Sequence, residues 1–181
     1  FLVSFHREEN ILDPRKVQKF VDLLDYLAKE YKHKVIVSTH FRTKEVLKQK
    51  KYSNNLVEFH KPFGFIDYIN LEINSKIVFS DSGSLTEESS ILNFPAIDLR
   101  EENERPEGME EGIVTLTGLD FKKIKIGIKF LLDKKKKINK SKKISVDDYK
   151  SLNFSDKVVN TIISYINYVN KKNWFKHTDS D

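Results

Sequence analysis

Short apolar runs alternate with amphipathic segments along most of this chain, and this alternation limits the folds that it can adopt. The runs are rich in Val, Ile and Phe and have the length of buried strands, whereas the segments between them repeat their apolar residues at helical spacing. Strands that alternate with helices form a parallel sheet covered by helices on both faces. We therefore predict an α/β fold with a doubly covered parallel sheet.

The expected elements can be placed along the chain. Strands are predicted at residues 1–5, 35–37, 56–59, 77–79, 96–99 and 113–116. Helices are predicted at residues 14–31, 43–51, 65–73 and 85–92, with a last helix beginning near residues 155–156. In the first of these helices Asp13 stands at the N-cap and Pro14 at the first helical position. Residues 121–132 fit both a strand and a helix pattern, and their length favours a helix.

The length of 181 residues suits one domain with an appendage. We predict a sheet domain at residues 1–133, a lysine-rich linker at 134–145, a helical segment at 146–173 and a flexible tail at 174–181. The chain opens inside an apolar run at Phe1, and its only methionine is Met109, so we expect it to be a piece of a longer protein.

One short run accounts for the basic charge of the chain. Residues 134–143 hold seven lysines and no acidic residue, while the rest of the chain has 25 basic residues against 27 acidic ones. A nucleic-acid-binding protein usually carries its basic surplus over a whole face or groove, so we expect no nucleic-acid partner. The run could bind nucleic acid or an anionic membrane by itself. It lacks interleaved aromatic residues, however, and a solvated linker explains it better.

The composition also excludes several kinds of site. The chain has no Cys, which excludes disulfides and thiolate metal sites and fits a reducing compartment, so we expect a cytoplasmic protein. No pair of His residues has metal-ligand spacing, and we expect neither a protein-bound metal nor another cofactor. No apolar stretch approaches the roughly 18–20 residues that a membrane-spanning helix needs, so we expect no insertion into a membrane.

Polar and charged residues follow the predicted strands, at the point where each strand ends. They are His6 and Arg7 after the first strand, His40 after the second, and residues 60–62, 81–84 and 100–105 after the next three. In a parallel sheet these strand ends meet at one edge, where such sheets bind ligands. Cationic groups beside a Ser/Gly turn favour an anionic ligand that carries hydroxyl groups.

Ser82, Gly83 and Ser84 join a predicted strand to a predicted helix. A helix N-terminus offers about four unpaired N–H groups and roughly half a positive charge. The glycine would let a phosphate approach the backbone, and the two serine hydroxyls would add hydrogen bonds. Alternatively, one serine is an ordinary N-cap, and Glu87 or Glu88 closes a capping box. The local sequence leaves both interpretations open.

Three other residues also carry two interpretations each. His6, with Arg7 beside it, is either an anion-binding group or a structural histidine with a surface charge next to it. Arg105 lies in a polar loop that is either solvated or closes over a ligand. Tyr68 could contact a planar base, although aromatic residues on a helix more often belong to the core.

Four separated motifs occur in a familiar order. They are Phe5-His6-Arg7-Glu8-Glu9-Asn10, Ser80-Asp81-Ser82-Gly83, Glu87-Glu88-Ser89, and Arg100 with Glu104-Arg105-Pro106-Glu107. In order and spacing they resemble the non-hydrolysing UDP-N-acetylglucosamine 2-epimerase family over roughly residues 1–132. Several motifs in register make this resemblance far more specific than any one of them would.

The resemblance implies a fold and a reaction. The fold is the glycosyltransferase-B architecture, in which two Rossmann-like domains hold a UDP-sugar in the cleft between them. This chain would be the second, UDP-binding domain, with its last helix crossing toward the first. The reaction inverts C2 of a UDP-2-acetamido sugar by eliminating UDP and adding it back on the other face. The family's proton-transferring carboxylates lie in the first domain, and a homodimer is the family's usual assembly.

The resemblance also implies roles for individual residues. It assigns His6 to the leaving phosphate, Ser82, Gly83 and Ser84 to phosphate at a helix N-terminus, Glu88 to the ribose hydroxyls, and Pro62 and Tyr68 to the uracil. Arg105 lies in the matching charged loop and is predicted as a catalytic residue together with His6.

Two departures from the family pattern narrow the resemblance. Ser84 stands where the family usually has a second glycine, and residues 40–43 replace a His-x-Asn-Pro pattern. With residues 61–68 and 105–109, they resemble a capsule or O-antigen branch that makes UDP-N-acetyl-L-fucosamine from a UDP-2-acetamido-2,6-dideoxy-hexose. Two alternatives stay open: a glycosyltransferase with the same donor domain, and a non-catalytic binding module that uses the lysine run.

Overall fold

The computed structural model describes residues 1–39, 43–45, 47, 52–137 and 145–176. The chain divides into two units, Phe1–Tyr149 and Lys150–Asp181. The first unit holds a sheet with helices on both faces, and the second holds one long helix. His40, the predicted tail beyond residue 176 and most of the lysine run lie outside the described residues.

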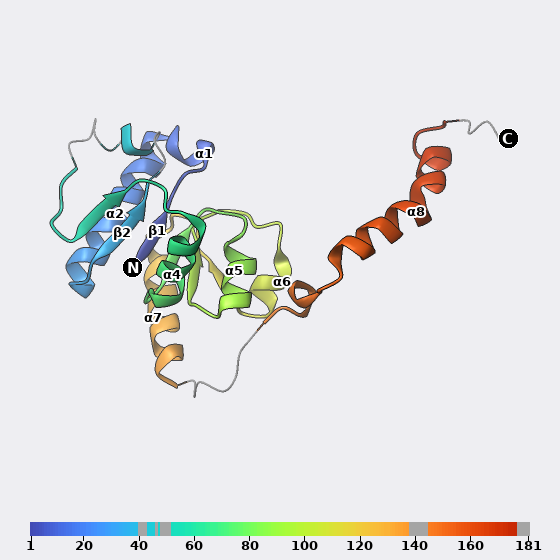
Figure 1. Ribbon diagram of the computed structural model, residues 1–181. Coiled ribbons are helices and arrows are strands. Elements are labelled where there is room, and N and C mark those ends of the chain that lie inside the picture. The colour runs from blue at the N-terminus through green and yellow to red at the C-terminus, as the bar shows by residue number, and fades with distance from the viewer. Residues whose placement is uncertain (40–42, 46, 48–51, 138–144, 177–181) are drawn as a thin grey trace. The chain divides into compact units, whose positions relative to one another are not determined.

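The elements follow the predicted alternation closely (Figure 1). The strands are β1 (Leu2–Ser4), β2 (Val35–Ser38), β3 (Val57–His60), β4 (Val78–Ser80), β5 (Ala96–Asp98) and β6 (Val114–Leu116). The helices are α1 (Glu8–Ile11), α2 (Pro14–Tyr31), α4 (Phe65–Asn74), α5 (Leu85–Leu92), α6 (Pro106–Glu110), α7 (Phe121–Lys137) and α8 (Phe154–Lys172), with a 3-10 turn at Asp147–Lys150.

All six strands run parallel in the order β3-β2-β1-β4-β5-β6. This is the strand order of a doubly wound, Rossmann-like sheet, so the predicted fold class is confirmed. The connection from β3 to β4 crosses from one half of the sheet to the other. The strand order therefore reverses between β1 and β4, which pair directly, with Ser4 opposite Ser80. The loops after these two strands therefore start side by side, at the position where sheets of this kind bind ligands.

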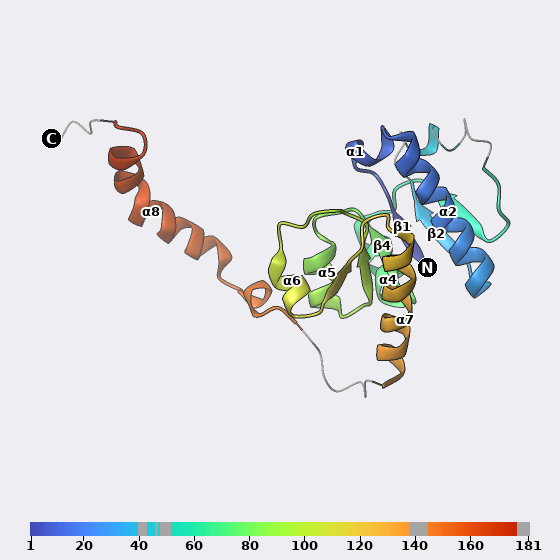
Figure 2. The same ribbon diagram turned by 180° about the vertical axis from the view of Figure 1, so that it is seen from behind.

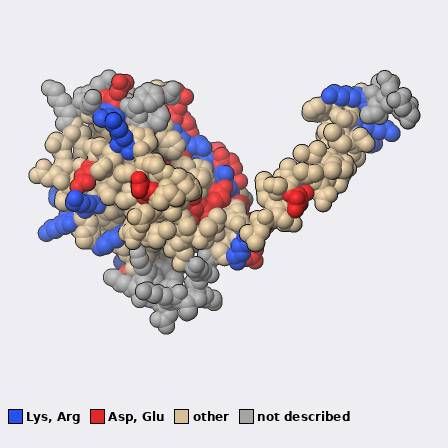
Figure 3. Space-filling model, viewed as in Figure 1, with Lys and Arg blue, Asp and Glu red and all other residues tan. Residues whose placement is uncertain are grey.

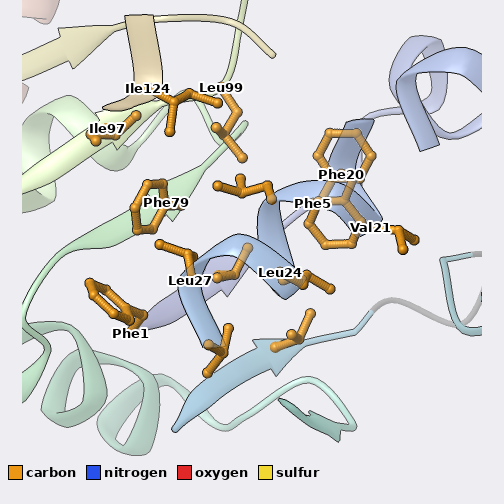
Figure 4. Packing of buried hydrophobic residues seen from close by; sticks show 14 of the residues in the cluster. Phe1, Phe5, Phe20, Val21, Leu24, Leu27, Phe79, Ile97, Leu99 and Ile124 are labelled. Atoms are coloured by element: carbon orange, nitrogen blue, oxygen red, sulfur yellow. The ribbon is translucent and has the colours of Figure 1, made fainter. Parts of the chain in front are cut away.

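Each face of the sheet has its own hydrophobic core. On one face α2 and α7 pack against side chains such as Val3, Phe79 and Ile97 (Figure 4). On the other face α4, α5 and α6 pack against a smaller cluster that includes Leu2 and Val78. The two opposite views show this layering, since α4 and α5 lie in front in Figure 1 and α7 in front in Figure 2. Burial on both faces explains why the strands read as continuous apolar runs.

The predicted caps of α2 are present. The Asp13 side chain accepts a hydrogen bond of 2.8 Å from the Arg15 N–H, and Pro14 occupies the first helical position. The helix ends at Lys32, which adopts a left-handed conformation with φ of 51°.

The ambiguous segment beginning at residue 121 is helical, as its length predicted. This helix, α7, continues to Lys137, through the first four residues of the predicted linker.

Two short helices, α1 and α6, arise in segments that the sequence left unassigned, because four or five residues are too few to show a periodic apolar stripe. Of the predicted helix at residues 43–51, residues 43–45 and 47 are described and are helical. In the first unit, Val146 is buried in the smaller core and its N–H donates to the Ser90 hydroxyl at 2.9 Å.

In the second unit, α8 begins one residue before the predicted Ser155, and its described residues include none that is buried. The side chains of Ile162, Ile163 and Ile166 are at least half exposed, and that of Val158 is 40% exposed. None of the described helices combines the length and apolar character needed to cross a membrane.

Candidate functional site

The side chain of Asp81 ties together the loops that follow β1 and β4. Asp81 is completely buried at the end of β4, and its carboxylate accepts hydrogen bonds from the backbone N–H groups of His6 (3.1 Å) and Arg7 (2.9 Å). It also accepts a bond of 3.0 Å from the Asn10 amide on α1. One carboxylate thus joins segments more than 70 residues apart in sequence, at the switch point of the sheet.

The His6 imidazole is held by the same carboxylate. Its Nδ1 lies 3.0 Å from Asp81 Oδ1, and the side chain remains 43% exposed. This hydrogen bond raises the pKa of His6 above its ordinary value. Burial raises the pKa of Asp81, but hydrogen bonds from His6, Asn10 and Arg7 outweigh it and leave that pKa below its ordinary value. Because Asp81 occupies Nδ1, Nε2 is the nitrogen with which His6 can meet a ligand.

The turn between β4 and α5 is built from small residues. The Ser82 N–H donates to the Ser80 hydroxyl at 3.0 Å, and the Ser82 and Ser84 hydroxyls lie 3.0 Å apart. Ser84 occupies the N-cap of α5, but its side chain makes no capping hydrogen bond. The capping-box interpretation is therefore not observed, and the two hydroxyls flank the first turn of α5 together with its backbone N–H groups.

Arg105 lies directly over this turn. A Cβ atom placed on Gly83 would stand 3.4 Å from Arg105 Nη1, so the guanidinium rests against the glycine backbone. Its Nε donates to the Glu87 carboxylate, and this hydrogen bond raises the pKa of Arg105. The arrangement places a fixed cation, one-third exposed, beside the N-terminus of α5.

The polar loop that carries Arg105 is held by hydrogen bonds, although the side chains of Glu101, Glu102 and Glu104 are exposed. Asn103 accepts a hydrogen bond of 2.9 Å from the Arg105 N–H and donates one of 3.0 Å to the buried Asp98. Pro106 then starts α6, and a Cβ atom on Gly108 would lie only 2.0 Å from the Thr86 methyl group. The absence of a side chain at position 108 therefore lets α6 approach α5 closely and sets the place of Arg105.

Glu88 lies half-buried in the first turn of α5, near Tyr68 and Glu72 of α4. Tyr68 is also half-buried and packs against the smaller core, as expected of an aromatic residue on a helix. Burial raises its pKa, and the negative charge of Glu72 raises it further. Glu72 is completely buried, and burial followed by the charge of Glu88 raises its pKa to about 8.

The structure brings most of the predicted site residues together. His6 and the Ser82–Ser84 turn meet through Asp81, and Arg105 touches Gly83. Pro62 is different, because it is exposed between β3 and α4 and the described contacts do not link it to the others.

Three contributors were not predicted as site residues: Asp81, which anchors His6; Glu87, which holds Arg105; and Glu72, which is buried beside Glu88. Asp81 had a recognisable signal, since a carboxylate directly after a buried strand needs donors nearby. The other two depend on packing between helices, which no local pattern reveals.

Charge is mixed around the site. Figure 3 shows acidic and basic side chains interleaved on the side of the first unit that carries α1 and α6. Next to the site lies an open cavity of about 450 Å³, whose lining includes Arg7, Lys16, Arg100 and Glu104. Within the described ranges no group of three or more His, Asp or Glu side chains could hold a metal ion. His6, Arg105 and the backbone N–H groups at the start of α5 are donors suited to an anionic ligand.

Known proteins resemble this chain in sequence. A family model described as UDP-N-acetylglucosamine 2-epimerase matches residues 1–163. The UDP-N-acetylglucosamine 2-epimerase of Methanocaldococcus jannaschii is 33% identical over 141 residues, which are 75% of this chain and 38% of that protein.

Solved structures resemble it in fold as well. The UDP-N-acetylglucosamine 2-epimerase from Rickettsia bellii is 36% identical with a TM-score of 0.78, over 97% of this chain and 47% of that one. The Methanocaldococcus jannaschii enzyme in complex with UDP-GlcNAc and UDP is 29% identical with a TM-score of 0.74, over 91% of this chain and 45% of that one. The chain spans less than half the length of each of these proteins.

Proposed function

This chain belongs to the UDP-N-acetylglucosamine 2-epimerase family, and we propose that it is the UDP-binding half of an enzyme that inverts C2 of a UDP-2-acetamido sugar. The proposal draws on the family match over residues 1–163 and on the structure of a relative solved with UDP-GlcNAc and UDP. The observation that carries it is the carboxylate of Asp81, which holds His6 beside the N-terminus of α5.

The reaction that we propose has two steps. A base removes the proton from C2 while the bond between C1 and the UDP oxygen breaks, and UDP leaves with the electron pair. The product of this step is a glycal with a double bond between C1 and C2. A proton then adds to C2 from the opposite face, and UDP adds back to C1. The residues of this chain hold the leaving group, and the proton-transferring carboxylates would come from the partner domain of a two-domain enzyme.

Leaving-group stabilisation is the chemistry for which this site is suited. Negative charge grows on the β-phosphate as the C1–O bond breaks, and fixed donors aimed at that charge lower the barrier without reorganising. His6 would donate from Nε2 in its protonated form, which the hydrogen bond to Asp81 favours. Arg105 and the turn at Ser82–Ser84 would surround the same phosphates. These groups would also keep UDP bound between the two steps.

The nucleoside would lie beyond the phosphates. We assign Glu88 to the ribose hydroxyls, because a carboxylate in the first turn of α5 is one helical turn from the phosphate-binding end. The uracil would lie toward Pro62 and the start of α4. Tyr68 packs into the core, so its part in uracil binding would be to position the backbone of α4.

We further propose a specific substrate, a UDP-2-acetamido-2,6-dideoxy-hexose, which the enzyme would convert to UDP-N-acetyl-L-fucosamine in capsule or O-antigen synthesis. Support comes from Ser84 in place of a second glycine and from the motifs at residues 61–68 and 105–109. We also propose a homodimeric, cytoplasmic enzyme, in keeping with the family and with the lack of Cys.

Incubation of the full-length protein with UDP-sugars in D₂O tests the function. We expect inversion at C2 with incorporation of one deuterium there, observed by proton NMR. Comparing UDP-sugars with and without the 6-hydroxyl tests the proposed substrate, because the 2,6-dideoxy sugar, which lacks this hydroxyl, should be epimerised faster. Transfer of the sugar to an acceptor without inversion at C2 would contradict an epimerase and favour a glycosyltransferase.

A further inference from the structure

Glu72 is a buried acid that the proposed reaction does not use. It lies on α4 with 0% of its surface exposed, and neither oxygen of its carboxyl group has a hydrogen-bond partner of ordinary geometry among the described residues. A buried carboxylate without donors is costly, because it gives up its hydration and receives nothing in return. A side chain in this state is therefore expected to be neutral or to have a partner that forms on ligand binding.

Among the described residues, the neighbouring charge that acts on the pKa of Glu72 is negative. Burial raises the pKa of Glu72 to about 8, and the negative charge of Glu88 on α5 adds to this effect. Tyr68 lies one turn earlier on the same helix, and its hydroxyl interacts with Ser4 of β1. The charges of Glu72, Glu88 and Asp81 all act on Tyr68, so these groups share one neighbourhood.

Two neighbouring carboxyl groups cannot easily both be ionised. Of this pair Glu72 is completely buried and Glu88 is half-buried, so the proton belongs on Glu72. A protonated carboxyl group has one O–H donor, whereas an ionised carboxylate only accepts. The pair can therefore form one strong hydrogen bond from Glu72 to Glu88, of the charge-assisted kind.

We propose that Glu72, as a neutral acid, donates a hydrogen bond to Glu88 and holds that carboxylate in position for the ribose hydroxyls of UDP. Glu72 does not touch the nucleotide and is a positioning residue that acts through Glu88. This inference rests on the proposed function, because it concerns the same nucleotide site.

Two substitutions separate the hydrogen bond from packing. Glu72→Gln keeps the shape and an N–H donor toward Glu88, whereas Glu72→Leu keeps the volume and removes the donor. Isothermal titration calorimetry on the full-length protein measures the affinity for UDP and for 2′,3′-dideoxy-UDP, which lacks the hydroxyls that Glu88 would bind. Glu30→Gln, an exposed substitution on α2, is the matched control.

We expect Glu72→Leu to weaken UDP binding about tenfold, the usual effect of losing a hydrogen bond to a charged group. It should leave the affinity for 2′,3′-dideoxy-UDP unchanged. Glu72→Gln should bind UDP like the unsubstituted protein at pH 7. At pH 9 the unsubstituted protein should have lost affinity as Glu72 ionises, and Glu72→Gln should have kept it.

The possible failures point to different conclusions. Equal losses for UDP and 2′,3′-dideoxy-UDP would mean that Glu72 only supports the fold, and wild-type affinity in Glu72→Leu would mean that it has no role. Either result overturns the inference and leaves the proposed function intact. If the unsubstituted protein did not bind UDP at all, the proposed function itself would be contradicted.

Discussion

At the level of single residues, the site depends on how buried carboxylates are matched with donors. Asp81 has two backbone N–H donors, an amide donor and an imidazole, and it stays ionised although it is buried. Glu72 has no such donors among the residues that the structure describes, and it is expected to carry a proton. Both acids are completely buried, yet the pKa of Glu72 is raised and that of Asp81 is lowered, because their neighbours differ.

The first prediction concerns Asp81→Asn. The amide cannot stabilise a protonated imidazole as the carboxylate does, so the pKa of His6 should fall toward its ordinary value of 6.5 or below it. Proton NMR titration of the His6 ring measures this shift. The affinity for UDP at pH 7 should fall as well, because less of His6 is protonated. An unchanged titration curve would mean that Asp81 does not control His6.

The pH dependence of this pair follows from the two pKa directions. The raised pKa of His6 contributes stability that is complete below pH 6.5 and is lost as the pH rises through the folded-state pKa. The lowered pKa of Asp81 contributes stability that is present above pH 3.8 and is lost as the pH falls through its folded-state pKa. The pair should therefore stabilise the fold most between these two values.

Glu72 predicts a pH dependence of its own. Its carboxyl group keeps a proton in the folded state up to about pH 8 and releases it above about pH 4.5 in the unfolded state. Between these values the folded state binds the additional proton, so the free energy of unfolding should fall as the pH rises. Urea denaturation between pH 5 and pH 9 should show a smaller fall for Glu72→Gln. An identical fall in both proteins would contradict the raised pKa.

At the level of helices, α5 and α6 each have a feature that sets the geometry of the site. The N-terminus of α2 has a side-chain cap from Asp13, whereas Ser84 at the N-terminus of α5 makes no such bond. The short helix α6 is placed by its close approach to α5 at Gly108. Both features set the positions of groups to which we assign ligand binding.

Ser84→Ala tests whether the serine is a cap or a ligand-binding group. Removal of a capping side chain typically costs about 1 kcal/mol. Because Ser84 makes no capping bond, the free energy of unfolding should change by only a few tenths of a kcal/mol, while the affinity for UDP falls. Asp13→Ala is the matched control and should lose about 1 kcal/mol without affecting UDP binding. The opposite pattern would restore the capping interpretation.

Gly108→Ala tests the contact between α5 and α6. Alanine usually stabilises a helix relative to glycine, but here the added Cβ would lie 2.0 Å from the Thr86 methyl group. We expect a loss of about 1–3 kcal/mol, as for other overpacked sites, and weaker UDP binding because Arg105 moves with α6.

The double variant Gly108→Ala/Thr86→Ser provides the control. Serine lacks the obstructing methyl group and keeps the hydroxyl that faces Asn103, so stability and UDP affinity should both recover. If the double variant were no better than Gly108→Ala alone, the steric explanation would be wrong.

At the level of the whole chain, the core belongs to the first unit. Every buried hydrophobic residue in the described parts of the chain lies between Phe1 and Val146, on one or the other face of the sheet. The predicted site residues, from His6 to Arg105, lie within the same unit. Folding and nucleotide binding should therefore both be properties of this unit.

A fragment of residues 1–149 tests this expectation. It should unfold cooperatively at the same temperature as the 181-residue chain, because the described residues of α8 bury nothing. Circular dichroism at 222 nm and calorimetry measure the transition, and titration with UDP measures binding. A fragment that fails to fold, or a much lower midpoint, would show that the second unit contributes to the core.

The sequence predicted much of this structure from local patterns. Six apolar runs became six parallel strands, and the Asp13-Pro14 pair began a helix as expected. The family motifs correctly indicated the epimerase family. The short helices α1 and α6 were missed, because their few residues have no apolar periodicity and are held by contacts made elsewhere in the chain.

Local order was decided by periodicity and by cap and turn residues, since each acts over only a few neighbouring positions. The chemistry of the site was decided by tertiary structure. Asp81 reaches His6 because β4 pairs with β1, and Arg105 reaches Gly83 because α6 packs closely on α5. Burial between two helices, followed by the charge of Glu88, raises the pKa of Glu72. Charge and position in these pairs depend on desolvation and on partners distant in sequence, and both arise only when the sheet and its helices assemble.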